Sequence, residues 1–478
     1  MGLFRHKRLS KIKRHAVYAL IVKEYKIFMT HDMTKGSLLP LLIGFTIPLI
    51  LGNFLQLTYN AVDSIILGRF VSAGALAAAG TCNPLMTLII MAMQGMTMGA
   101  GILIGNLYGA GQMEKLRRQV STAMIAGCVF SLAVTFLVLL SAGQLLGLMQ
   151  VDPLIMDLCL LYLRIVSCGL IFNFIYNFFA AVMRAMGDSR SPLIFLGISA
   201  LVNIGGDLFF VIVLNLGTLG CALSTVFSEA LSCLLCWLFI KRHIPVLDMG
   251  RQWLVFDRSL LTRTLRYGSV SALQQSAVQL GIVSVQGMVN SMGYMATAAF
   301  AAAGRIDSFV LIPERNISNA MTNVMAQNMG AGEKKRVRDT FRIGLGLDIV
   351  YALATGLLLF VFCRPSMQLF TEEEEVIGLG VIYLRLIALM YILPALTNCV
   401  QGYFRGVGDL RITLVSTLLN MGSRVAVCFF LTARTSLGIA SVPWACMAGW
   451  VAMTVYEAPF LVRLERRLKG ESGGEAPL

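Results

Sequence analysis

Arg184-Ala-Met-Gly-Asp-Ser-Arg190 is repeated in this chain as Arg405-Gly-Val-Gly-Asp-Leu-Arg411, 221 residues later (405 minus 184). Three further matches share this offset: Tyr162-Leu163-Arg164 with Tyr383-Leu384-Arg385, Gly109-Ala110-Gly111 with Gly330-Ala331-Gly332, and Gly217 with Gly438. Four coincidences at one offset indicate that the two halves are copies of one another. A repeat of this length in an apolar chain is typical of a transporter whose pathway lies between its two halves.

The composition places both copies in a membrane. Of 478 residues, 57% are hydrophobic and 13% are charged, which leaves too little polar surface to cover a soluble protein. Twelve apolar runs are long enough to span a bilayer. They cover approximately residues 38–67, 75–106, 119–141, 153–181, 192–214, 218–240, 265–291, 296–328, 340–362, 375–402, 412–433 and 438–462. We therefore predict an all-α integral membrane protein with twelve transmembrane helices in two pseudo-symmetric six-helix bundles. Because each copy has an even number of spans, both copies enter the membrane from the same side and are parallel repeats.

The spans divide the chain into five parts. These are a basic cytoplasmic N-terminal segment (1–37), a first six-helix lobe (38–240), a cytoplasmic linker (241–263), a second lobe (264–462) and a cytoplasmic tail (463–478). The charges of the first segment would also suit a signal peptide, but no small-residue cleavage site follows its apolar patch. The linker is either an amphipathic strap at the membrane surface or a plain connection. The runs at 75–106 and 296–328 exceed one span, which predicts tilt or a kink.

Lys and Arg are distributed unevenly between the two ends of these spans. With both termini in the cytoplasm, the inner segments hold 31 of the 39 basic residues, the outer loops three and the spans five. Because basic loops stay in the cytoplasm, we predict a multi-pass plasma membrane protein with both termini inside. Topology and attraction to anionic lipids then explain the net charge of +14, and no nucleic-acid binding is inferred.

The motifs that the sequence lacks exclude several energy sources. Without a Gly-x-x-x-x-Gly-Lys-Ser/Thr loop the chain does not itself hydrolyse ATP in that way, and we expect no enzymatic activity. All four histidines lie outside the spans, which excludes an intramembrane histidine relay. Cys233 and Cys236 could form a metal or redox pair, but nothing completes such a site, and we expect buried thiols. If transport is driven, carboxylates must carry the coupling.

Carboxylates inside the spans are therefore the main candidates for function. A charge at the bilayer centre costs about 2.5–3.5 kcal/mol on insertion scales and is usually kept for use. Seven acids qualify by position: Asp63, Asp207, Glu229, Asp307, Glu314, Asp348 and Glu457.

Two polar stripes in the first lobe stand out among these groups. Asp63 shares a helix face with Gln56 and Tyr59, and Asp207 lies one turn after Asn203. Thr225 could add a hydroxyl and Tyr162 a phenol. These oxygen ligands could hold a small hard cation such as Na⁺, or share a proton. Alternatively, Asn203 and Asp207 hydrogen-bond only each other and a neighbouring helix.

From about Gly36 to Arg463 the chain resembles the multidrug and toxic compound extrusion (MATE) family. The resemblance rests on motifs in a fixed order: Ile47-Pro48, Tyr59-Asn60-x-x-Asp63, the Gly-Ala-Gly turns, the Arg-x-x-Gly-Asp-x-Arg turns and Asn203-Ile-x-x-Asp207. It implies two six-helix bundles forming a V, which alternate between inward-open and outward-open states. It also implies export of cationic or amphipathic drugs in exchange for Na⁺ or H⁺, with no other cofactor, by a protein that we expect to be a monomer.

The resemblance also assigns residues. The family's cation site matches Asp63, Asn203, Asp207 and Thr225, and we place Gln56, Tyr59, Tyr162 and Arg424 at the substrate. Some members instead carry coupling acids on the seventh and tenth helices. In this chain the seventh run and the interior of the tenth contain no acid, which favours coupling in the first lobe.

The second lobe diverges from the first, because Arg424 occupies the position of Asn203. We hypothesise that Arg424 forms an internal ion pair with Asp307 or Glu314. Methionine, phenylalanine and tyrosine are expected to line the drug cavity. An alternative function is a flippase for a lipid-linked precursor, for which a strongly basic cavity would be expected.

Overall fold

The computed structural model describes residues 32–247, 250 and 254–470, and all regular structure within them is helical. The first lobe contains α2 (Leu38–Ile66), α3 (Ala73–Gly109), α4 (Met113–Leu148), α5 (Pro153–Ala185), α6 (Arg190–Leu208) and α7 (Gly217–His243). The second contains α8 (Arg258–Asn290), α9 (Tyr294–Gly330), α10 (Lys334–Gln368), α11 (Glu374–Met390), α12 (Ile392–Val407), α13 (Leu410–Arg434) and α14 (Ser441–Lys469). Most of the predicted N-terminal segment, Arg251 and Trp253 of the linker, and residues 471–478 of the tail lie outside the described residues.

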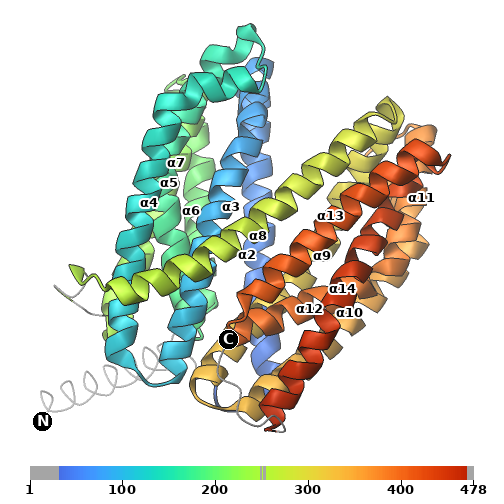
Figure 1. Ribbon diagram of the computed structural model, residues 1–478. Coiled ribbons are helices and arrows are strands. Elements are labelled where there is room, and N and C mark those ends of the chain that lie inside the picture. The colour runs from blue at the N-terminus through green and yellow to red at the C-terminus, as the bar shows by residue number, and fades with distance from the viewer. Residues whose placement is uncertain (1–31, 248–249, 251–253, 471–478) are drawn as a thin grey trace, which may run out of the picture.

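The predicted duplication is confirmed by the positions of the helices. Moving α3 by 221 residues gives the bounds of α9, and the two lobes form the arms of a V (Figure 1). The repeated turn has the same backbone in both copies, with φ of 91° at Gly187 and 88° at Gly408. Glycine accepts this left-handed conformation without a steric penalty, so it ends one helix sharply. Asp188 then caps the next helix, because its Oδ1 accepts from the backbone N–H groups of Arg190 and Ser191, both at 3.0 Å.

The described residues contain ten or eleven of the twelve predicted spans by length and composition. Ten helices are long and apolar enough to cross a membrane, and α11 with α12 forms an eleventh span bent by 50°. The prediction of one continuous helix over 375–402 is therefore wrong: the chain bends at Tyr391, three residues before Pro394. The twelfth predicted span corresponds to α8, which is too polar to be counted with them, and its Gln274, Gln275 and Gln279 side chains face the space between the lobes. The two overlong runs form α3 and α9, with 37 residues each.

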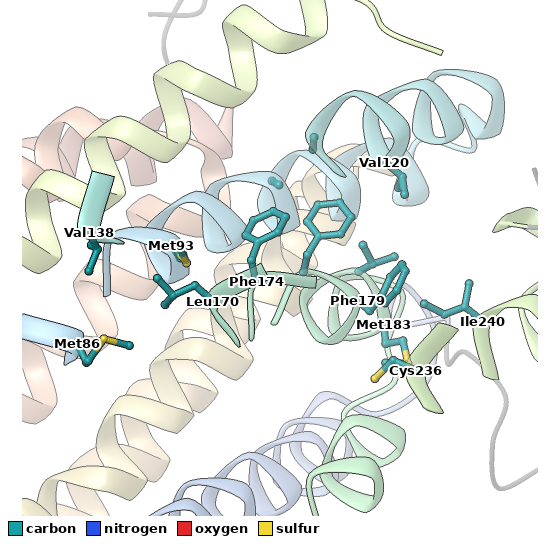
Figure 2. Close-up of a cluster of buried hydrophobic side chains, with 14 of the residues drawn as sticks. Met86, Met93, Val120, Val138, Leu170, Phe174, Phe179, Met183, Cys236 and Ile240 are labelled. Carbon is teal, nitrogen blue, oxygen red and sulfur yellow. The ribbon is translucent and has the colours of Figure 1, made fainter. Parts of the chain in front are cut away.

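Each lobe has its own apolar core. In the first lobe, α5 supplies the centre: Phe174 and Phe178 stack with ring centroids 5.9 Å apart, and Met93 of α3 lies nearby (Figure 2). Cys236 is fully buried in this cluster as a free thiol, which agrees with the packing role predicted for it. These cores allow each lobe to behave as a packed unit.

The first helix of each repeat crosses between the lobes. Near its start α8 is held by α4 of the first lobe, where the Gln119 amide donates to Thr264 Oγ1 at 2.6 Å. Farther along α8, the Gln274 amide donates to Thr417 of α13 at 3.0 Å, so the helix runs diagonally across the V (Figure 1). In the same way, the start of α2 is packed in a core cluster of the second lobe, while its later part contacts α6. The lobes are thus joined by two crossing helices, α2 and α8, as well as by the linker.

The left-handed turn at Gly187 gives a test of the fold. Gly187→Ala should lower the melting temperature of the purified protein, because an L-residue in this conformation costs roughly 1–2 kcal/mol. Gly80→Ala is the matched control: Gly80 is helical, and its added Cβ would meet no atom within 4 Å. Equal melting temperatures for the two variants would contradict this account of the turn. Thermal unfolding in detergent followed by intrinsic fluorescence makes the measurement.

Candidate functional site

The two lobes meet closely where α3 and α9 end. A Cβ on Gly109 would overlap the carbonyl oxygen of Gln327, and one on Gly330 would overlap that of Asn106. The two contacts are related by the 221-residue repeat, so the interface has local two-fold symmetry. Gln327 also donates to the Ala185 carbonyl of α5 at 3.4 Å. The cavity between the lobes is therefore closed at this end, which also carries the described chain ends (Figure 1).

The segment before α2 adds to this closure. The backbone N–H of Met33 donates to the Gln327 side chain at 2.6 Å, and its carbonyl accepts from Asn328 at 3.1 Å. Arg336 donates to the carbonyls of Gly36 and Lys35. The chain thus enters the first helix from a fixed point on the second lobe.

A cavity of about 750 Å³ lies between the lobes. Every described spanning helix except α4 and α10 contributes to its wall. The expectation of a lining rich in Met, Phe and Tyr is only partly correct, since Phe300 is the one phenylalanine among the described lining residues. Asn, Gln, Ser and Thr side chains instead form a large part of the wall, because most large apolar groups pack into the cores or face outward on the lobes.

The structure brings the predicted carboxylates of the first lobe together. One ligand atom each from Asp63, Asp207 and Cys221 lie within 4.8 Å of one another. Asp207 is fully buried, and neither of its oxygens nor Asp63 Oδ1 has a geometrically satisfactory hydrogen-bond partner among the described residues. Two ionised carboxylates this close repel each other strongly where water is scarce. The pair therefore requires a cation or a proton between its members.

Each carboxylate lies just before a change in helix geometry. A π-helical turn over Leu67–Val71 follows α2, and another over Phe209–Val213 follows α6. The two turns contact each other and α7. π-Helical turns in α-helices are rare and are often found at functional sites, where a register change redirects side chains.

Asn203 lies one turn before Asp207 on α6, and Thr225 lies one turn after Cys221 on α7. Asn203 is buried, and its amide and carbonyl both contact the Ser224 hydroxyl, at 3.4 and 2.8 Å. Thr225 lines the cavity and donates to the Cys221 carbonyl of its own helix at 3.0 Å, so its oxygen can still accept. The sequence did not identify Ser224 or Cys221, because only the rotation of α7 decides which of its faces meets Asp207.

Polar side chains on the helices of the carboxylate pair line the cavity. Gln56 and Tyr59 both do so, and they lie about two turns and one turn before Asp63 on α2. Tyr162 of α5, which we placed at the substrate, is not among the described residues that line the cavity. Glu229 also lines the cavity, one turn beyond Thr225, and accepts from the Asn173 amide at 2.7 Å. It was identified in the sequence as an intramembrane acid but was not assigned to the site.

The second lobe presents arginines to the same cavity. Arg315, Arg405 and Arg424 line it, together with Asp307, which accepts from the Tyr391 hydroxyl at 2.8 Å. The predicted ion pair of Arg424 is wrong for this structure: among the described residues, no carboxylate lies within 4.0 Å of its guanidinium. The guanidinium instead lies over the Trp450 ring, 5.3 Å from its centroid. The repeat register gave the position of Arg424 but not the direction of its side chain.

Comparison with known proteins identifies relatives over most of the chain. The sequence model of the MatE family matches residues 48–209 and 271–430, more than half of the chain. A probable multidrug resistance protein of Bacillus subtilis, YoeA, is 28% identical over 446 residues, covering 91% of this chain and 94% of that protein. A probable multidrug resistance protein of Thermotoga maritima, NorM, is 23% identical over 421 residues, covering 86% and 88%. The structure of a MOP superfamily transporter from Pyrococcus furiosus is 22% identical, with a TM-score of 0.84, and covers 92% of this chain and 98% of that one.

The glycine contact between the lobes predicts a change in dynamics. Gly109→Ala should push α3 and α9 apart, because the overlap with the Gln327 carbonyl involves backbone and cannot be relieved by a side-chain rotation. Hydrogen exchange measured by mass spectrometry should then become faster in residues 324–334. Gly143→Ala, on the outer helix α4 with no atom near the new Cβ, should leave these peptides unchanged. Unchanged exchange in Gly109→Ala would show that the ends of the helices tolerate separation without opening.

Proposed function

Since this chain belongs to the MatE family, we propose that it is a secondary antiporter of the plasma membrane that exports cationic or amphipathic compounds in exchange for Na⁺ or H⁺. The observation that carries the proposal is the Asp63–Asp207 pair, which forms no ion pair with a described Lys, Arg or His and lies on two helices that line a cavity shared by both lobes. The proposal includes the topology inferred from the basic loops, with both termini in the cytoplasm. The closed end is then the cytoplasmic end, and the protein acts as a monomer.

The coupling follows from electrostatics at the pair. Na⁺ or a proton bound between Asp63 and Asp207 removes their repulsion and allows α2 and α6 to approach at their π-helical turns. Tyr59 of α2 and Asn203 of α6 line the cavity, so a movement of these helices alters the surface that a substrate meets. An ion can drive export only if it binds the two states of the transporter with different affinities. The carboxylates, Asn203 and the hydroxyls of α7 would hold the ion, and the other cavity residues would hold the substrate.

A flippase for a lipid-linked precursor is a second candidate. It is favoured by one observation, the four arginines that line the cavity: Arg184, Arg315, Arg405 and Arg424. Such a protein would move a lipid without needing an ion at the carboxylate pair of the first lobe. The two functions therefore differ in their dependence on Asp63 and Asp207.

Efflux measurements in liposomes test the antiporter. Purified protein should export ethidium under an imposed Na⁺ gradient or an imposed pH gradient. The gradient that drives efflux identifies the coupling ion. Asp63→Asn and Asp207→Asn should each reduce the rate to that of empty liposomes, because an amide neither binds a proton in this range nor pairs with Na⁺ as a carboxylate does. Asp157→Asn, which changes an exposed acid of α5, should have the rate of the unmodified protein. Ethidium efflux under neither gradient, from folded protein, would contradict the antiporter and favour the flippase.

Glu229 gives a second prediction that separates substrate binding from coupling. Glu229→Gln should weaken ethidium binding about tenfold, because a carboxylate that faces the cavity loses its charge. The variant should keep ion-driven efflux at saturating ethidium, since Asp63 and Asp207 are intact. Fluorescence titration measures the affinity, with Glu375→Gln at an exposed position as the control. Loss of coupling with unchanged affinity would instead assign Glu229 to the ion.

A further inference from the structure

The repeat allows the two walls of the cavity to be compared position by position. Four cavity-lining positions of the first lobe are Gln94, Arg184, Asn203 and Glu229, and their counterparts 221 residues later are Arg315, Arg405, Arg424 and Trp450. All eight line the cavity. At these positions the first wall carries one arginine and one carboxylate, and the second carries three arginines. The two copies have therefore diverged. The first lobe forms a wall with no net charge at these positions, which includes the Glu229 carboxylate, and the second lobe forms a cationic wall.

Two of these arginines have no anionic partner of their own. Arg315 and Arg424 form no ion pair within 4.0 Å in the described part of the chain. Neither donates a hydrogen bond there, whereas Arg405 donates to the Ser318 hydroxyl at 2.8 Å. Asp307 is the one carboxylate of the second lobe among the described lining residues, and it lies in the electrostatic range of both Arg315 and Arg424. Glu314 also lies in the electrostatic range of Arg315 but does not line the cavity, so the charged lining residues of the second lobe are three arginines and one carboxylate.

Arg424 is also held in a fixed orientation. Its guanidinium lies over the Trp450 ring, and its Nε is buried without a partner among the described residues. A guanidinium fixed in this way keeps its planar set of N–H donors, which matches the two oxygens of a carboxylate or phosphate. An aromatic surface beside it would pack against the apolar part of the same ligand.

We infer that the cationic wall binds an acidic group, and that the preferred substrates are amphipathic zwitterions with a carboxylate or phosphate directed at Arg315 and Arg424 and a positive group directed at Glu229. This inference deepens the proposed function, on which it rests for the export step. It differs from export of simple cations, because the substrate's acidic group contributes to affinity rather than opposing it.

Two dyes that differ only at the acidic group provide the test. Rhodamine 110 has a free carboxylate and a cationic ring system, and rhodamine 123 is its methyl ester. Binding is measured by fluorescence polarisation with the full chain in phosphatidylcholine nanodiscs, which requires no ion gradient. The result is therefore independent of whether the antiporter mechanism holds. Rhodamine 110 should bind about tenfold more tightly than rhodamine 123, as expected for a charge-assisted hydrogen bond.

Variants assign the preference to the arginines. Arg315→Gln and Arg424→Gln should each remove most of the tenfold preference by weakening rhodamine 110 alone, and Arg424→Lys should retain part of it. Arg305→Gln is the matched control, since Arg305 is an exposed arginine of α9 outside the cavity wall. Glu229→Gln should weaken both dyes equally. Equal affinities of the two dyes for the unmodified protein, or no binding of rhodamine 110, would overturn the inference.

The phosphate of a lipid headgroup could bind the same arginines. One further experiment distinguishes a lipid from a substrate taken from water. The rhodamine 110 titration is repeated in nanodiscs that also contain phosphatidylglycerol. Unchanged affinity supports a substrate taken from water. Displacement of the dye would assign the cationic wall to a lipid headgroup and overturn the assignment to a zwitterionic substrate.

Discussion

The contact between the backbones of α3 and α9 at Gly109 and Gly330 is the constraint on which the rest of this molecule depends. Two helices can approach this closely only where neither carries a Cβ, and the repeat places one glycine on each. The lobes are pinned together at one end and diverge toward the other, which creates the cavity (Figure 1). A single short contact thus determines which end of the pathway is closed.

Burial of charge explains how the two lobes divide their tasks. In the first lobe, two acids face each other across α2 and α6 in a position that favours a small cation or a proton. In the second lobe, the counterparts of these two acids are Ser284 and Cys428, whereas the counterparts of Asn203 and Glu229 are Arg424 and Trp450, which line the cavity. Because repulsion inside a membrane protein is costly, each arrangement is stable only with its own kind of counter-charge. The shared ancestry of the lobes therefore no longer implies a shared ligand.

Much of the fold could be predicted from the sequence, because the 221-residue repeat and the apolar runs are local signals. Gly187 and Gly408 identify the helix ends, since few other residues accept their backbone angles. The bend at Tyr391 was missed because both of its flanks are apolar and hydropathy cannot distinguish one span from two halves. Asp63 and Asp207 could be selected from seven intramembrane acids by the polar stripes on their helices and by the family resemblance. Ser224, and the orientation of Arg424 over Trp450, depend on helix rotation, which one sequence does not encode in its spacing.

The crossing of α2 and α8 has a consequence for how the chain can be divided. Each of these helices begins on one lobe and continues into the other, so each half of the polypeptide donates its first helix to the other's packing. The halves have exchanged their first helices, so they would remain bound to each other if the linker were cut. Two separately synthesised halves would form a stable lobe only in each other's presence, so the ancestral single-repeat protein would have needed a second copy of itself.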